Sequence, residues 1–208
     1  MREVVLDEFF RSSHLSELLT WYCEPNRWEI DEAENCLRIR PDAQTDFWQQ
    51  THYGFSADNG HFLYTTVNTD FVMTTEVRFH PANQYDQAGL MVWFSPSCWL
   101  KTSVEYEPGG PNRLGAVVTN SGYSDWSTQD FPEDCREVRL RVRREGVDYI
   151  VDASAGSGSW SQIRLARLLD DRKGANVRCG VYACSPKGEG FAAEFLALNI
   201  VRGRIDDI

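Results

Sequence analysis

The stretch between residues 45 and 61 concentrates side chains that could do chemistry. It holds two of the four histidines, His52 and His61, together with Tyr53 and Asp58. Imidazole, phenol and carboxylate groups gathered in this way are more than the packing of a core requires, and ligand pockets combine an apolar floor with a few polar groups. Two interpretations remain open, namely part of a polar, aromatic pocket wall or an aromatic core with polar turns.

A second group of candidate residues comes from the alternating segment 99–107. Trp99, Lys101 and Glu105 have the same parity, so a strand would point them to one face. Lys101 and Glu105 lie four residues apart, ~13 Å along a strand, and can flank one ligand but cannot pair directly without help. The alternatives are a solvated sheet face for these two charges and core packing for Trp99. We expect any ligand surface to lie on this charged face.

Further aromatic and polar candidates lie elsewhere in the chain. Trp126 lies in a Ser-Asp-Trp-Ser motif, and Asp86 and Gln87 come at the start of an apolar run. Tryptophan and tyrosine rings could stack on sugar rings, while the polar groups could bind hydroxyls. The predicted ligand-binding set is His52, Tyr53, Asp58, His61, Asp86, Gln87, Trp99, Lys101, Glu105 and Trp126.

Metal chemistry lacks a convincing set of ligands. Zinc needs three or four convergent histidines or cysteines, and His52 and His61 supply two without a third. Calcium needs clustered oxygen ligands, and Asp58 followed by Asn59 supplies too few. No glycine-rich phosphate loop precedes a helix, and no serine nucleophile elbow is present. We expect no metal and no other cofactor.

A β-hairpin over residues 85–107 must position the charged face. Residues 87–94 form a near-continuous apolar run of strand length, which is typical of a strand buried on both faces. Ser95-Pro96-Ser97 is a turn signal, and the alternating segment follows it. The sequence therefore predicts a buried strand next to a strand that carries charge on a single face.

The other elements also follow a strand period. Residues 71–79 alternate cleanly, and residues 136–154 read as a hairpin whose turn at Glu145-Gly146 would place Arg143 opposite Asp148 and Arg139 opposite Asp152. Residues 12–19 could make one or two helical turns, and residues 160–168 are ambiguous between strand and helix. Strands recur every 10 to 15 residues with turn signals between them. This spacing predicts an all-β antiparallel sandwich.

The whole chain has the size and composition of one globular domain. It has 208 residues, and we expect a single domain over 1–208. The formal net charge of −10 argues against nucleic acid or an anionic membrane as a partner, because both need a basic footprint. No signal-peptide core or membrane-length apolar run is present, and the six cysteines are irregularly spaced. We expect a cytoplasmic protein with free thiols.

Several motifs together resemble a known family of unknown function, typified by the yeast regulation-of-enolase protein. The resemblance covers about residues 21–201. It rests on Asp46-Phe47-Trp48, Thr51-His52-Tyr53-Gly54-Phe55, Asn59-Gly60-His61-Phe62, residues 85–92, residues 99–106, Val117-Val118-Thr119 and Ser124-Asp125-Trp126-Ser127. It implies the concanavalin A-like lectin/glucanase jelly roll, an antiparallel β-sandwich with a ligand surface on its concave sheet. Such folds host lectins, glycosidases and adaptors, so the fold alone does not give the function.

Glycoside hydrolysis can be tested directly against the residues. The reaction needs two carboxylates ~5 to ~9.5 Å apart. Glu105 and Glu107 would lie ~6.6 Å apart on one strand and would be the catalytic pair if the protein is an enzyme. However, the Glu-x-Asp-x-x-Glu and Glu-x-Asp-x-Glu signatures of the related glucanases are absent, and Glu107 sits at the strand end.

We therefore expect a non-catalytic binding module for a carbohydrate or a sugar-derived metabolite, bound on the concave sheet. The first alternative is a protein-interaction or regulatory domain of carbon metabolism, with a metabolic enzyme as its partner. The second alternative is a glycoside-active enzyme. The sequence indicates no oligomeric state.

Overall fold

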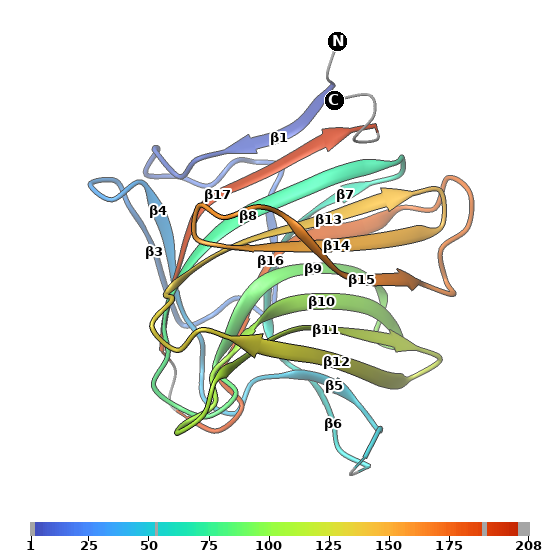
Figure 1. Cartoon of the computed structure of the whole chain (residues 1–208). Coiled ribbons are helices and arrows are strands. Elements are labelled where there is room, and N and C mark those ends of the chain that lie inside the picture. The colour runs from blue at the N-terminus through green and yellow to red at the C-terminus, as the bar shows by residue number, and fades with distance from the viewer. Residues whose placement is uncertain (1–2, 53, 189–190, 204–208) are drawn as a thin grey trace.

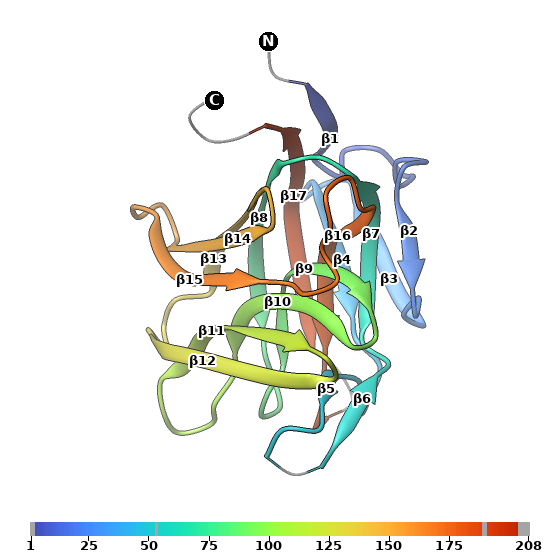
Figure 2. The ribbon, with the colours of Figure 1, turned by 90° about the vertical axis from the view of Figure 1, so that its right-hand side faces the viewer.

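The computed structural model describes residues 3–52, 54–188 and 191–203, and these residues form strands and no helix. Two large antiparallel sheets and one small hairpin make up the molecule (Figure 1). The eight-stranded sheet has the order β15 (Ser161–Arg167), β14 (Asp148–Ala155), β13 (Glu137–Glu145), β8 (Phe71–His80), β17 (Ala192–Arg202), β4 (Cys36–Arg40) and β3 (Arg27–Asp31), with β1 (Val4–Glu8) also paired to β17. The seven-stranded sheet has the order β12 (Tyr123–Phe131), β11 (Asn112–Asn120), β10 (Cys98–Glu105), β9 (Gln87–Ser95), β16 (Val177–Cys184), β7 (His61–Val67) and β2 (Thr20–Tyr22). The small hairpin pairs β5 (Phe47–Gln49) with β6 (Ser56–Asp58) and lies next to β12 (Figures 1 and 2).

The main core lies between the two large sheets, which confirms the predicted all-β sandwich. Leu90 and Leu100 of the seven-stranded sheet and Val77, Leu140 and Phe195 of the eight-stranded sheet are fully buried in one cluster. Because side chains alternate along a strand, the opposite faces of β9 and β10 point away from this core. We call that face of the seven-stranded sheet the outer face.

A smaller apolar cluster covers part of the outer face. Trp99 of β10, Met91 of β9 and Tyr182 of β16 pack there with Phe47 of β5, and all four are buried. The hairpin β5–β6 therefore contributes a residue that shields the outer face from water, although it belongs to neither large sheet.

The predicted hairpin over residues 85–107 is present as β9 and β10, with Gln87 opposite Glu105 and Met91 opposite Lys101. Its parity is also as expected, but the exposure is not. Every residue of β10 is buried, including Lys101 and Glu105, which are 2% and 8% exposed. The predicted charged strand is therefore covered by other elements rather than solvated.

Two local predictions are wrong. Residues 12–19 form no helix, because the serine hydroxyls of Ser12 and Ser16 accept hydrogen bonds from the amides two residues ahead and compete with helical bonding. In the β13–β14 hairpin the turn falls one residue later than predicted, so Asp152 lies opposite Arg141 and not Arg139. Gly146 has a φ of 69°, which a tight hairpin turn requires and glycine adopts readily.

The ambiguous segment at residues 160–168 is a strand, β15 at the edge of the eight-stranded sheet. All six cysteines are free thiols, four of them buried. Across the described ranges, no helix is long and apolar enough to cross a membrane.

Candidate functional site

A pocket of about 790 Å³ opens on the outer face of the seven-stranded sheet. Strands β9, β10 and β12 supply part of its lining, and the segment around β5 supplies another part. Its lining residues are Asp46, Trp48, Thr51, His52, Phe55, Tyr85, Gln87, Lys101, Glu105, Trp126, Pro186 and Lys187.

One wall of the pocket is a segment that we call the strap, residues 43–58, described at every position except 53. One end of the strap is fixed beside the end of β16. Ala43 bridges to Ser185, the Thr45 amide donates to the Ser185 carbonyl at 3.3 Å, and the Ser185 amide donates to Thr45 Oγ1 at 3.0 Å. Thr45 and Ser185 are both buried, so their two hydrogen bonds hold this end of the strap in place.

The strap is fixed again at the far edge of the same sheet. The Gln49 amide donates to the Ser124 hydroxyl of β12 at 2.8 Å. Between the two attachments, the Phe47 ring packs against Trp99 and Tyr182, with centroids 6.2 and 6.4 Å away. The strap therefore crosses the outer face and closes one side of the pocket.

Lys101 is the centre of a buried polar network on the pocket floor. Its ammonium group donates to Asp46 Oδ1 at 3.0 Å and to Gln87 Oε1 at 2.8 Å. Gln87 Oε1 also accepts from the Tyr182 hydroxyl at 3.0 Å. Burial is the largest single effect and would lower the pKa of Lys101, but the nearby acidic groups, Asp46 foremost and Glu105 among them, together outweigh it and the pKa is raised. Lys101 therefore stays charged at neutral pH.

Glu105 lies on the same face as Lys101 and opposite Gln87. Burial raises the pKa of Glu105 to about 7, and the positive charge of Lys101 only partly offsets this effect. No hydrogen bond joins its carboxyl group to the part of the chain that the structure describes. Glu105 thus presents a carboxyl group to the pocket that can donate or accept a proton near neutral pH.

The mouth of the pocket is aromatic. Trp126 on β12 is 41% exposed and Phe55 of the strap is 50% exposed, although both are large and apolar. Trp48 is held in place because its indole N–H donates to the Thr51 carbonyl at 3.0 Å. The pocket therefore joins a charged, hydrogen-bonding floor to an apolar rim, as many small-molecule sites do.

The structure brings together half of the predicted ligand-binding residues. His52, Gln87, Lys101, Glu105 and Trp126 line the pocket. Tyr53 lies outside the described residues. The other four predicted residues, Asp58, His61, Asp86 and Trp99, do not line it.

His61 and Asp86 are placed elsewhere because each is used to hold loops. The His61 ring accepts from the Asp42 amide at 3.0 Å and lies 2.6 Å from the Cys23 carbonyl oxygen. The Asp86 carboxylate accepts from two amides of the turn before it and from the Ser185 hydroxyl at 2.6 Å. Both side chains are buried and have protein hydrogen-bond partners, so their role is structural rather than ligand binding.

Asp58 and Trp99 also have local partners. Asp58 accepts from the Tyr22 hydroxyl at 2.8 Å, and its own pKa is raised by burial. Trp99 lies on the predicted face, but it is fully buried in the outer-face cluster, where the Phe47 ring packs against it edge to face. Its indole N–H donates to the Pro96 carbonyl at 3.2 Å. Trp99 is therefore not available for stacking on a ligand.

Sequence reasoning missed seven lining residues. Asp46 is the most important because it pairs with Lys101, and it lies in the Asp46-Phe47-Trp48 motif, which was a signal that could have found it. The remaining six are Trp48, Thr51, Phe55, Tyr85, Pro186 and Lys187.

The carboxylate pair considered for hydrolysis is not assembled in the pocket. Glu107 follows the end of β10, accepts from Gln84 Nε2 at 2.7 Å, and does not line the pocket. The second carboxylate beside Glu105 is instead Asp46. Within the described part of the chain, no group of three or more histidine, cysteine, aspartate or glutamate side chains could hold a metal ion.

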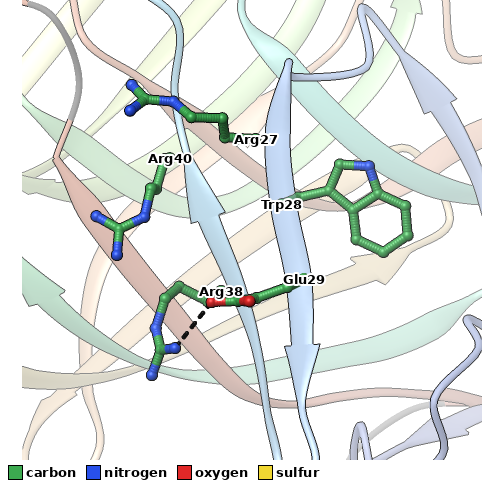
Figure 3. Close-up of a pocket in the computed structure, with 5 residues that line it drawn as sticks. All are labelled: Arg27, Trp28, Glu29, Arg38 and Arg40. Atoms are coloured by element: carbon green, nitrogen blue, oxygen red, sulfur yellow. Dashed lines mark hydrogen bonds and ion pairs between the residues drawn. The ribbon is translucent and has the colours of Figure 1, made fainter.

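A second, smaller hollow of about 240 Å³ lies over β3 and β4 (Figure 3). The side chains of Arg27, Arg38 and Arg40 extend to one side of these strands, and Trp28 extends to the other. Arg38 pairs with Glu29 at 3.0 Å and with two further carboxylates, so its charge is already balanced. Arg27 and Arg40 lie directly opposite each other across the strands. Of the two, Arg40 is exposed at the end of β4 and places a positive charge on the surface of an acidic protein.

Comparison with known proteins identifies relatives over nearly the whole chain. A family model described as "protein of unknown function (DUF1349)" matches residues 21–202. "Regulation of enolase protein 1" of Saccharomyces cerevisiae is 32% identical over 176 residues, which is 85% of each chain.

Solved structures share the fold. A functionally unknown protein from Saccharomyces cerevisiae has a TM-score of 0.80 and 32% identity, covering 90% of this chain and 97% of that one. The GH43 BlXynB protein of Bacillus licheniformis has a TM-score of 0.73 at 16% identity, covering 95% of this chain but 39% of that chain. At this identity the second match shows the fold alone, a jelly-roll sandwich that also forms part of a glycoside hydrolase.

Proposed function

This chain belongs to the family described as protein of unknown function (DUF1349), and from that premise we propose that it is a binding module for a carbohydrate or a sugar-derived metabolite. The ligand occupies the outer-face pocket and is bound without being cleaved. Pockets of this size, with an aromatic mouth and few polar groups, suit small polar ligands that have an apolar ring face.

The observation that carries the proposal is the buried Lys101 network next to Glu105. A lysine that is 2% exposed costs free energy to bury, and a fold that needed only stability could use an apolar residue there. Here the charged group lines an open pocket, where it can donate to a ligand hydroxyl. Trp126 and Phe55 at the mouth are exposed in a position where a sugar ring could stack on them.

A screen by thermal shift against methyl glycosides, free sugars and phosphosugars tests the proposal. A ligand at 100 times its dissociation constant stabilises the native state by about 2.7 kcal/mol, which gives a clear rise in Tm. Trp126→Ala should reduce the rise, whereas Tyr123→Ala should not, because Tyr123 is an exposed aromatic of the same strand that does not line the pocket. No rise with any of these compounds, or an equal loss in both variants, would contradict the proposal.

A regulatory role through a protein partner is the second candidate, and two observations favour it. The relative that is 32% identical is named for regulation of enolase. Arg40 is exposed at the end of β4, beside the hollow over β3 and β4, and could meet an acidic partner. Sedimentation of the protein mixed with enolase tests this role, with Arg40→Glu expected to weaken any complex and Lys187→Glu, on the pocket side, expected to leave it unchanged.

A further inference from the structure

The strap divides the outer face into two separate areas. On one side lies the pocket, lined by Lys101, Glu105 and the mouth aromatics. On the other side lies an aromatic patch, in which the Arg178 guanidinium stacks between the rings of Tyr64 and Trp93 at 4.8 and 4.5 Å. None of these three patch residues lines the pocket. A long ligand lying across the sheet would have to pass the strap to reach both areas.

The strap leaves no passage at its centre. Phe47 is fully buried, with its ring 6.1 Å from Tyr22 on the patch side and 6.2 Å from Trp99 below it. The attachments at Ser185 and Ser124 hold the strap at Thr45 and at Gln49, on either side of Phe47. A passage would therefore require the loss of a buried aromatic contact and of buried hydrogen bonds, which is costly.

The polar floor offers three groups that one ring can engage together. Asp46 Oδ1 is occupied by Lys101 and by the Phe47 amide, but Asp46 Oδ2 is in no hydrogen bond with the described residues. Lys101 uses two of its three protons for protein partners. Glu105 supplies a second carboxyl group without such a partner.

A pair of adjacent hydroxyls complements this arrangement. Each hydroxyl can donate to a carboxyl oxygen, and one of them can also accept from the remaining Lys101 proton. On the floor, a negatively charged ligand group would meet two carboxyl groups and one already paired ammonium group, which disfavours it there. The other lysine of the lining, Lys187, is exposed. The floor thus favours a neutral ring with neighbouring hydroxyls.

We propose that the pocket accepts a single terminal sugar ring, or a free monosaccharide, and that the strap excludes internal segments of a longer chain. This inference rests on the proposed carbohydrate binding and adds the form of the ligand. The terminal ring enters past Trp126, and the rest of the chain leaves through the mouth into solvent.

Isothermal titration with ligands of increasing length tests the inference. The titrants are the methyl glycosides of glucose, mannose and xylose, and their β-1,4-linked dimers, trimers and hexamers. For the sugar that binds, we expect Kd to change by less than about threefold from monomer to hexamer, because only one ring is bound. We also expect one protein molecule to bind to each oligosaccharide molecule at every length.

Two variants distinguish a pocket that the strap closes on one side from a groove that continues past the strap. Trp126→Ala should weaken binding roughly five- to tenfold at every length, which corresponds to the loss of one aromatic stacking contact. Tyr64→Ala, beyond the strap, should leave Kd unchanged for the hexamer, with Tm measured to confirm folding. The contrary result is an affinity that rises more than tenfold with the length of the oligosaccharide, together with the loss of that gain in Tyr64→Ala. This result would refute the closed pocket, while the proposed carbohydrate binding would stand. If none of these sugars binds, both proposals fall.

Discussion

The Glu105 side chain in the pocket has a carboxyl group with an unusually high pKa. Its pKa is raised to about 7 from the usual 4.5, chiefly because it is buried. A raised carboxyl pKa means that the native state binds the proton more tightly than the unfolded chain does. Below about pH 4.5 the Glu105 carboxyl is protonated in both states and does not lower the free energy of unfolding. Between pH 4.5 and 7 its ionisation increasingly destabilises the native state, and this loss is complete above pH 7.

Glu105→Gln should consequently stabilise the protein only at higher pH. At pH 4 the variant and the parent should unfold at the same urea concentration. At pH 8 the variant should be more stable by on the order of 1 to 3 kcal/mol, because it no longer ionises a buried group. Glu107→Gln, at the partly exposed position just beyond β10, is the control for the loss of one carboxylate from the same segment. Equal stability of Glu105→Gln and parent at pH 8 would contradict the raised pKa.

Lys101 tests the buried ion pair. Lys101→Met removes the partner of Asp46 and leaves a partly buried carboxylate unpaired, so we expect a loss of about 3 kcal/mol in urea unfolding at pH 7. The double variant Lys101→Met/Asp46→Asn should recover part of this loss, since the uncompensated charge is gone. If the unfolding free energy of Lys101→Met lies within about 0.5 kcal/mol of that of the parent, the ion pair contributes no net stability.

Strand parity explains which site residues could be predicted from the sequence. Lys101 and Glu105 share a face of β10, and alternation alone places them together. The same logic fails for His61, because β7 begins at that residue and Phe62 takes the outer face instead. Only the contacts with Asp42 and Cys23 determine which way the ring points, and neither partner is near in sequence.

At the scale of elements, the strap determines the shape of the pocket. Thr45 and Ser185 are 140 positions apart in the sequence, so no local sequence pattern predicts that the strap crosses the sheet. The sequence did indicate a polar, aromatic wall over residues 45–61, and Trp48, Thr51, His52 and Phe55 form one. The sequence did not show that the strap attaches at Ser124 and Ser185, because long-range contacts of this kind depend on the whole topology.

Gly60 provides a test of the strap. A Cβ atom at Gly60 would come within 2.4 Å of the Phe47 ring and 2.5 Å of Cys184 Sγ, so Gly60→Ala must displace Phe47. We expect a loss of about 1 to 3 kcal/mol in unfolding free energy, as for other overpacked sites. The variant should also bind the sugar found in the screen more weakly, because Asp46 moves with its neighbour.

Gly110→Ala is the matched control for this change. No heavy atom lies within 4 Å of the position of its added Cβ, so stability and binding should stay close to those of the parent. If Gly60→Ala behaves like Gly110→Ala in both measurements, the strap is more yielding than its buried contacts imply.

At the scale of the whole molecule, the question is whether the two sheets unfold as one unit, as the single predicted domain requires. The thiols report on this because they are distributed over both sheets. Cys36 lies in the eight-stranded sheet, and Cys98, Cys179 and Cys184 lie in the seven-stranded sheet. All four are buried, and burial raises the pKa of Cys36 to about 11 and that of Cys179 to about 12. Neither location nor ionisation allows these thiols to react in the native state.

The native protein should therefore react with a thiol reagent at the exposed Cys23 before it reacts at the four buried thiols, which become accessible only on unfolding. Peptide mapping by mass spectrometry can follow each site in moderate urea. If the sandwich is one cooperative domain, Cys36 and Cys179 should be labelled at the same rate, since both are fully buried and each becomes accessible only when its sheet opens. Faster labelling of Cys36 would mean that the eight-stranded sheet opens alone. In that case the pocket sheet, with its strap attached at Ser124 and Ser185, would be the more stable unit of the molecule.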